Sequence, residues 1–260
     1  MSVPPPELFE YIGRLKGYRG DFTGAISTFT AGIGHHPADP RLYRHRGHRH
    51  LNLRQLTEAR QDFRRSLERM DGFADSRELG QERVLEQLEQ LVLGGPAVTA
   101  DGGYSASLPF KVHYHLALTE HFLGDDTEAV RQFEAALQDA DTTDLHVAVA
   151  NWLVVLYGYT GQQERAAELL QGISFTGQAG VNRFYQELLR LYRGELSAED
   201  LLERASSEPR ELATSGYGLA SWLLFQGRQQ QAVELLQRVI REGDAAAFGT
   251  IAAEIRLQNL

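Results

Sequence analysis

A short basic stretch, RLYRHRGHRH from Arg41 to His50, holds four arginines and three histidines within ten residues. Guanidinium groups bind carboxylates and phosphates through paired hydrogen bonds, and imidazole can ligate a metal or move a proton. The chain has 260 residues and a formal net charge of −9. Residues 41–69 nevertheless contain nine Arg against three Asp or Glu, a local charge of +6 that leaves −15 elsewhere. We therefore expect this segment to attract an acidic ligand.

A metal site is one alternative for the same histidines. His45 and His48 are three residues apart and could share a helix face, with His115 or His121 approaching from a neighbouring helix. The sequence contains no HExxH motif, and the arginines around the pair would repel a cation. We expect neither a metal nor another cofactor.

Catalysis is a second alternative. The chain lacks GxGxxG, GxxxxGK[ST] and GxSxG motifs, and it has no cysteine, which excludes disulfides and thiolate chemistry. Pairs such as Glu120 with His121, or Glu10 with His45, could act as acid and base, but such pairs are common on charged helices. We expect no catalytic residues, and an enzyme using His and Glu side chains stays open as an alternative.

Composition excludes two further partners. A pI near 5.5 and a basic patch confined to one segment argue against nucleic acid, which needs a sustained basic surface. The N-terminus has no basic start followed by a long apolar run, and the longest uncharged apolar run, Val147 to Tyr157, is too short to span a bilayer. We expect no membrane contact and a cytoplasmic location.

Small and aromatic residues recur with a period of 34 residues. Apolar positions around them recur at steps of three and four, which is typical of amphipathic helices. This pattern predicts pairs of antiparallel helices in which Gly13 and Ala25 allow close crossing and Phe29 fills the opposite gap. The repeated pairs are Gly13 with Gly47, Ala25 with Ala59, and Phe29 with Phe63.

These residues resemble the tetratricopeptide-repeat family, whose pattern places small and aromatic residues at fixed positions of a helix pair. The second repeat departs from it, because Arg46 and His50 stand where apolar residues are expected and the closing Pro is absent. A weaker repeat without the family's Ala spans RFYQELLRLYRGELSAEDLLERA. The first, third, fourth and last recognisable repeats contain Phe9, Ile12, Gly13, Gly20, Ala25, Phe29 and Pro37; Leu116, Ala117, Gly124, Ala129, Phe133 and Ala136; Leu153, Tyr157, Gly161, Ala166 and Leu170; and Leu219, Ala220, Gly227, Ala232 and Leu236.

The resemblance implies an all-α fold, an α-α superhelix of helix-turn-helix repeats closed by a C-terminal capping helix. We expect two repeats in residues 1–70, an irregular insertion in 71–109, three to four repeats in 110–244 and the capping helix in 245–260. The insertion contains one helix, about 76–93, and a Gly-, Ser- and Pro-rich loop, 94–109, which is either a surface loop or a lid. All four segments are expected to form one solenoid domain.

The resemblance also implies that the first helix of each repeat lines a concave surface. Anions are expected to meet the arginines, histidines and lysine at one end of this surface, and aromatic side chains are expected to anchor apolar groups at the other. The predicted ligand-binding residues are Arg41, Arg44, His45, His48, Asn52, Lys111, Tyr114, His115, Asn151, Trp152, Tyr159, Tyr185 and Tyr217.

The sequence thus predicts a non-catalytic scaffold that binds an acidic peptide or protein segment in a concave groove. A pocket that senses a small ligand or metal is the alternative, and pairing into a homodimer stays open. We expect Arg44→Glu or Trp152→Ala to abolish partner binding without changing the melting temperature. Protonated histidines would make anion binding weaken as the pH rises through about 6–7.

Overall fold

The computed structural model of the protein describes residues 3–74, 76–93, 104–175, 180 and 182–260. Within these residues the chain forms 14 helices and one two-stranded sheet, so the all-α prediction is confirmed. The contacts divide the chain into an N-terminal unit, residues 1–119, and a C-terminal unit, residues 120–260, which we describe separately. A single solenoid domain with the four expected segments stays a prediction.

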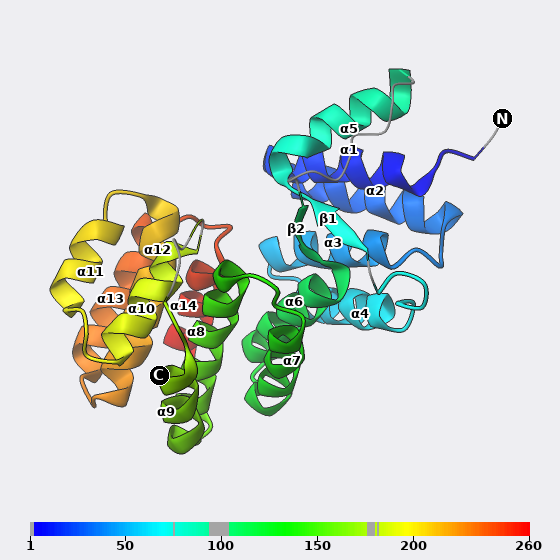
Figure 1. Ribbon diagram of the computed structural model, residues 1–260. Helices are drawn as coiled ribbons and strands as arrows, with labels where there is room; N and C mark the ends of the chain where they lie inside the picture. Colours follow the sequence, from blue (N-terminus) through cyan, green and yellow to red (C-terminus); the bar gives the residue numbers. More distant parts are fainter. Residues whose placement is uncertain (1–2, 75, 94–103, 176–179, 181) are drawn as a thin grey trace. The chain divides into compact units, whose positions relative to one another are not determined.

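The N-terminal unit begins with two helix pairs. Helix α1 (Pro6–Tyr18) packs on α2 (Phe22–His35), α3 (Pro40–Asn52) packs on α4 (Leu56–Leu67), and α2 and α1 both contact α3. The strand β1 (Arg77–Leu79), helix α5 (Gln81–Leu93), strand β2 (Tyr104–Ser107) and helix α6 (Leu108–Phe122) follow. Helix α5 lies against α1 (Figure 1).

The crossing of the paired helices follows the predicted use of small residues. A Cβ atom built on Gly13 would overlap the ring of Phe29, and one on Gly47 would lie 2.9 Å from Cε1 of Phe63. Both phenylalanines are fully buried. Because the aromatic ring occupies the space that a side chain would need, glycine is required at these two crossings.

The insertion contains the predicted helix, α5, and a feature that the sequence did not predict. Strands β1 and β2 pair antiparallel, with Arg77 opposite Ser107 and Glu78 opposite Ala106. They have three and four residues, too few for an alternating pattern to be distinguished from a loop. Residues 94–103 of the predicted loop lie outside the described residues. The strand pair matters for function because it holds Glu78 beside α3.

Six turns between paired helices share one geometry. The second residue after each first helix adopts a left-handed conformation, and the next N–H donates to the carbonyl five residues earlier, as Asp21 does to Lys16 at 3.0 Å. This bond satisfies an otherwise unpaired helix carbonyl. The left-handed residues are Gly20, Arg54, Gly124, Gly161, Gly194 and Gly227. Gly194 lies between α10 (Arg183–Tyr192) and α11 (Ala198–Ala205), so the weaker repeat is also a helix pair.

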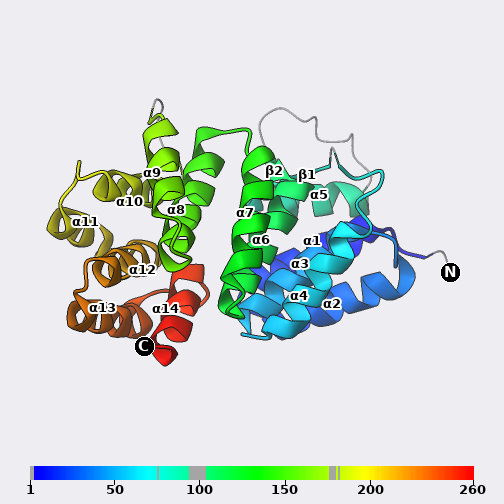
Figure 2. The same ribbon diagram turned by 90° about the horizontal axis from the view of Figure 1, so that it is seen from below.

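The C-terminal unit contains the remaining helices and the predicted cap. Helix α8 contacts α7, α9 and α10, and α12 contacts α10, α11 and α13. Helix α14 (Phe248–Gln258) packs on α12 and α13, as Figure 2 shows, and buries Ile251, so the capping-helix prediction is confirmed. No helix of the described residues is long and apolar enough to cross a membrane. The other bounds are α7 (Asp126–Gln138), α8 (Thr143–Tyr159), α9 (Gln163–Gly172), α12 (Pro209–Phe225) and α13 (Gln229–Glu242).

Candidate functional site

Most charged groups predicted to bind a ligand gather in one basic cluster of the N-terminal unit. Helix α3 starts at Pro40, with Asp39 accepting a hydrogen bond from the backbone N–H of Arg41 at 3.0 Å. From this start, steps of three and four residues place several basic side chains on the side of α3 that meets α1, α6 and β1. The basic cluster comprises Arg44, His45, His48 and Arg49 of α3, Glu10, Arg14 and Tyr18 of α1, Glu78 of β1, and Lys111 and His115 of α6.

Arg44 and Glu78 form the ion pair at the centre of the basic cluster. Nε of Arg44 lies 2.8 Å from Oε1 of Glu78. The two atoms are misaligned for a hydrogen bond, so both are buried polar atoms without one. Burial would raise the pKa of Glu78, but the cations Arg44 and Lys111 outweigh it and hold that pKa below its usual value. The Glu78 carboxylate is therefore ionised.

Two histidines of the basic cluster accept hydrogen bonds from arginines. Nη1 of Arg44 donates to Nδ1 of His45, and Nη2 of Arg49 donates to Nδ1 of His48, both at 2.8 Å. A guanidinium can only donate, so each Nδ1 is unprotonated and each imidazole is neutral. Burial, reinforced by the arginines, lowers the pKa of His45, His48 and His115 well below 6.5. The prediction that these histidines lose a positive charge, and so weaken anion binding, as the pH rises through about 6–7 is therefore wrong.

Arg49 and Lys111 are cations that form no ion pair with the side chains that the structure describes. Among the described side chains, no carboxylate lies within 4.0 Å of either group. Burial and neighbouring arginines lower the pKa of Arg49 to about 10 and that of Lys111 to about 8. Both groups are thus still mainly protonated at pH 7, although their surroundings disfavour the charge.

Arg41, at the start of α3, is already neutralised. Its guanidinium lies 2.5 Å from Oδ2 of Asp39 and 2.8 Å from Oε1 of Glu7. Burial would lower the pKa of Arg41, but its hydrogen bond to Asp39 and its charged neighbours outweigh this effect and raise the pKa. The guanidinium of Arg41, which was predicted to bind a ligand, is therefore already paired with carboxylates of the same unit.

The predicted open surface is only partly present in the N-terminal unit. The face of α3 that was expected to meet a ligand is covered by α1, α6 and β1, and this covering is the reason for the difference. Arg41, His48 and Lys111 are partly exposed. The prediction of exposure is wrong for Arg44, His45, Asn52, Tyr114 and His115, which are buried.

In the C-terminal unit, three predicted residues are core residues. Asn151, Trp152 and Tyr217 are at most 2% exposed, so the prediction that they line an open surface is wrong. Trp152 stacks on Phe133 with ring centroids 6.1 Å apart. Helix α8 is buried on all sides from Val147 to Tyr157, as expected of a central helix. Tyr159 and Tyr185 are partly exposed.

The sequence did not predict a buried hydrogen-bond chain around His121. Nδ1 of His121 lies 2.5 Å from Oδ1 of Asp126, and Nε2 lies 2.9 Å from the hydroxyl of Tyr217. Burial raises the pKa of Tyr217 well above 10, so its phenol stays protonated beside Nε2. Asp126 lies five residues after His121, so the sequence could have indicated this partner. Tyr217 lies 96 residues away, so no local pattern could have indicated it.

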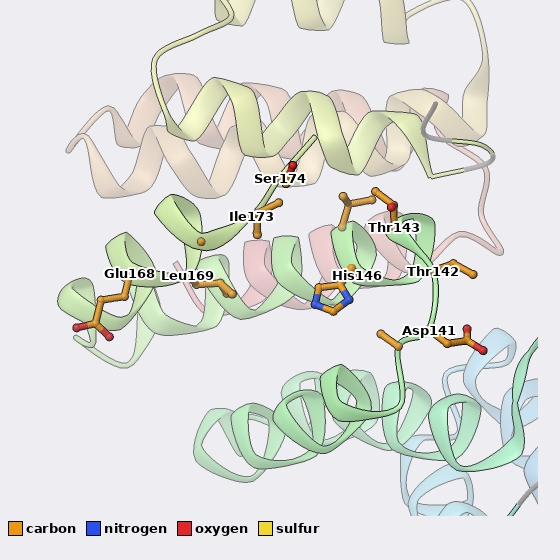
Figure 3. A pocket seen from close by; sticks show the side chains of 11 residues that line it. Asp141, Thr142, Thr143, His146, Glu168, Leu169, Ile173 and Ser174 are labelled. Carbon is orange, nitrogen blue, oxygen red and sulfur yellow. The ribbon is translucent and has the colours of Figure 1, made fainter. Parts of the chain in front are cut away.

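A pocket of about 600 Å³ lies between the start of α8 and the end of α9. In the view of Figure 3, His146 stands between Leu169 on one side and Thr142 on the other. None of the ligand-binding residues predicted from the sequence lines this pocket. In the part of the chain that the structure describes, no group of three or more His, Asp or Glu side chains could hold a metal ion.

Comparison with protein families gives one match. The sequence model of the tetratricopeptide repeat matches residues 215–242, which cover most of α12 and all of α13. The tetratricopeptide resemblance is confirmed. In this tetratricopeptide repeat, Ala220, Ala232 and Leu236 are buried around the left-handed Gly227, as the last predicted repeat requires. A search of curated proteins finds no match to the chain. A tetratricopeptide repeat suggests a scaffold for protein–protein interaction.

Proposed function

We propose that this protein is a non-catalytic scaffold that binds an acidic segment of another protein. The tetratricopeptide match supports a protein partner, because stacked helix pairs present extended faces to other chains. The proposal includes the predicted cytoplasmic location and no nucleic-acid partner. The observation that carries the acidic character of the segment is the state of Lys111.

Lys111 is the accessible cation of the basic cluster. Its side chain is partly exposed, whereas Arg44 behind it is 4% exposed. Among the described side chains no carboxylate pairs with its ammonium, in contrast to Arg41, which bonds Asp39 and Glu7. A carboxylate from a partner would thus gain a charge-assisted hydrogen bond without displacing an existing one.

Aromatic contacts to the same partner would come from fewer residues than the sequence predicted. Trp152 and Tyr217 are buried, so they do not belong to the proposed partner-binding residues. Tyr185 is partly exposed and packs against the core cluster that contains Leu189. Tyr159 is partly exposed and its hydroxyl donates to Ser221. Such half-buried tyrosines bury apolar area at a small cost in side-chain entropy.

The absence of catalysis in the proposal is supported by how the candidate acid–base groups are bonded. Both ring nitrogens of His121 are occupied, by Asp126 and Tyr217. The carboxylate of Glu10 accepts a hydrogen bond from Arg14 at 3.2 Å. His45 is buried and accepts from Arg44. In this arrangement none of these groups offers a substrate an accessible nitrogen or carboxylate oxygen.

The experiment uses the chain's two lysines, Lys16 and Lys111. Tagged wild-type protein, Lys111→Glu and Lys16→Glu are used to capture partners from the native cell extract, and captured proteins are quantified by mass spectrometry. We expect one set of proteins to be lost with Lys111→Glu and kept with Lys16→Glu, while circular dichroism shows equal helicity. The captured partner is then purified, and its binding should weaken as the salt concentration rises.

Two results would contradict the proposal. Equal capture by the two lysine variants would show that Lys111 does not meet the partner. Binding of the purified partner that does not change with salt would show that its acidic groups are not recognised.

A further inference from the structure

Three buried polar atoms of the basic cluster lack hydrogen bonds. They are Nε of Arg44, Nε2 of His45 and Oε1 of Glu78, in side chains that are at most 7% exposed. His45 Nε2 lies 3.4 Å from Glu10 and 3.8 Å from Glu78, too far for a good hydrogen bond. Buried polar atoms are nearly always paired in folded proteins, so three together need an explanation.

The same region holds more positive than negative charge. Arg14, Arg44, Arg49 and Lys111 are cations, whereas Glu10 and Glu78 are the carboxylates of the cluster. Arg14 pairs with Glu10, and Arg44 pairs with Glu78, which leaves two positive charges uncompensated within the cluster. Uncompensated buried charge is strongly unfavourable, so an anion bound here would remove a large penalty.

Arg44 and Lys111 are placed to share such an anion. Arg44 lies close enough to Lys111 and His115 to lower the pKa of both groups, and the ring of His115 lies 4.6 Å from that of His48, one helical turn after Arg44 on α3. Arg44 still has an unused Nε–H, and Lys111 has three donors without an ion pair. Lys111 and His48 are partly exposed, so an anion can approach from solvent on their side.

We propose that the basic cluster binds a phosphate-type oxyanion beside Lys111 and Arg44. A phosphate monoester carries a charge of about −1.5 to −2 at pH 7 and has three strong acceptor oxygens. Its charge offsets the excess of the cluster, and its tetrahedral oxygens can accept from the ammonium and the guanidinium at once. The step is binding alone, with no bond made or broken.

This inference goes beyond the proposed function, because a free phosphate compound needs no partner protein. The two share Lys111 but fail separately. The capture experiment detects binding of a protein partner, whereas a phosphate titration detects binding of the anion to the purified protein without a partner. Inorganic phosphate, glycerol phosphate and a phosphoserine peptide share the chemistry that the cluster would recognise.

The test is isothermal titration of the full chain with inorganic phosphate, at ionic strength held constant with sodium chloride. Wild-type protein is compared with Lys111→Met and, as the matched control, Lys16→Met. We expect phosphate to bind the wild type and Lys16→Met equally, and Lys111→Met at least about tenfold more weakly, the effect of losing one charge-assisted hydrogen bond. Without phosphate, Lys111→Met should melt at a higher temperature than the wild type, because it removes an uncompensated cation.

Parallel titrations distinguish a phosphorylated protein segment from a free phosphate compound as the source of the phosphate group. Tighter binding of a phosphoserine peptide than of inorganic phosphate, with no binding of the serine peptide, would identify a phosphorylated protein segment. Equal binding of inorganic phosphate and glycerol phosphate, with a weaker peptide, would identify a free phosphate compound. Heat signals no larger than those of matched sodium chloride, or equal affinities of the two methionine variants, would overturn the inference.

Discussion

The imidazole rings of His48 on α3 and His115 on α6 lie 4.6 Å apart, centroid to centroid. Arg49 donates to Nδ1 of His48, and Nδ1 of His115 donates to the carbonyl of Lys111 at 2.6 Å. Nδ1 of His48 is therefore unprotonated, and burial lowers the pKa of both histidines well below 6.5, so two like charges do not meet at this contact near pH 7. Protonation of the imidazole rings of His48 and His115 would therefore weaken the packing of α3 on α6.

The histidines of the basic cluster predict acid sensitivity. The pKa values of His45, His48 and His115 are lowered in the folded state, so below about pH 6.5 the unfolded chain binds protons that the folded chain does not. Stability is therefore lost as the pH falls, by up to about 1.4 kcal/mol per pH unit for each histidine. Urea denaturation between about pH 7 and 5 measures this slope.

Two variants assign the acid sensitivity to the cluster. His48→Gln should reduce the slope by about one third, because one of three similar groups is removed. His146→Gln, at an exposed position of α8, should leave it unchanged. A His48→Gln slope as steep as that of the wild type would contradict the assignment.

Arg54 holds a backbone conformation that glycine adopts in the five equivalent turns. Its φ is 59°, in the left-handed region that costs a non-glycine residue about 1 kcal/mol. We expect Arg54→Gly to raise the free energy of unfolding by about 0.5–1 kcal/mol, since the relief exceeds the added entropy of the unfolded chain. Chemical denaturation checks this. Gly20→Ala, at the same place in the first repeat, should be destabilising, and a loss of stability in Arg54→Gly would refute the comparison.

The close crossing at Gly13 predicts a coupled pair of substitutions. Gly13→Ala places a methyl group against the buried ring of Phe29 and should cost about 1–3 kcal/mol of stability. The smaller side chain of Phe29→Leu should make the same Gly13→Ala substitution less costly. A double-mutant cycle with both changes measures the coupling, and additive effects would show that the ring does not fill this space.

Two aromatic residues of the C-terminal unit should behave as core residues. Trp152→Ala should lower stability by about 3–5 kcal/mol, because the indole is 1% exposed. Tyr217→Phe should cost about 1–3 kcal/mol, because it leaves Nε2 of His121 without its hydrogen-bond partner. Thermal melting of both variants checks these values. An unchanged melting temperature in Trp152→Ala, as the sequence predicted, would place the indole on the surface.

The repeat architecture could be predicted because it is encoded locally. Glycine is needed where Phe29 and Phe63 fill the helix crossings, and left-handed turns favour glycine, so both leave a periodic record in the sequence. Even the weaker repeat kept Gly194 at its turn. The spacing alone was enough to locate these helix pairs.

Exposure could not be predicted because it depends on distant segments. The helical period places Arg44 and His45 on one face of α3, but only the folded structure shows that α1, α6 and the strand with Glu78 cover this face. Trp152 likewise follows the family's pattern, and its burial results from the packing of α8 against several helices. The basic composition was visible in the sequence, whereas the fold was needed to show that none of the described carboxylates lies within 4.0 Å of Lys111.

The charge state of Lys111 gives the sharpest experiment. Its amine is acylated in competition with that of Lys16 over a range of pH, and the two modified peptides are quantified by mass spectrometry. We predict a midpoint near pH 8 for Lys111, moving to higher pH when phosphate is added because a bound anion favours the protonated amine. A midpoint near the ordinary lysine value of about 10.4, unmoved by phosphate, would contradict an uncompensated, partly exposed cation at Lys111.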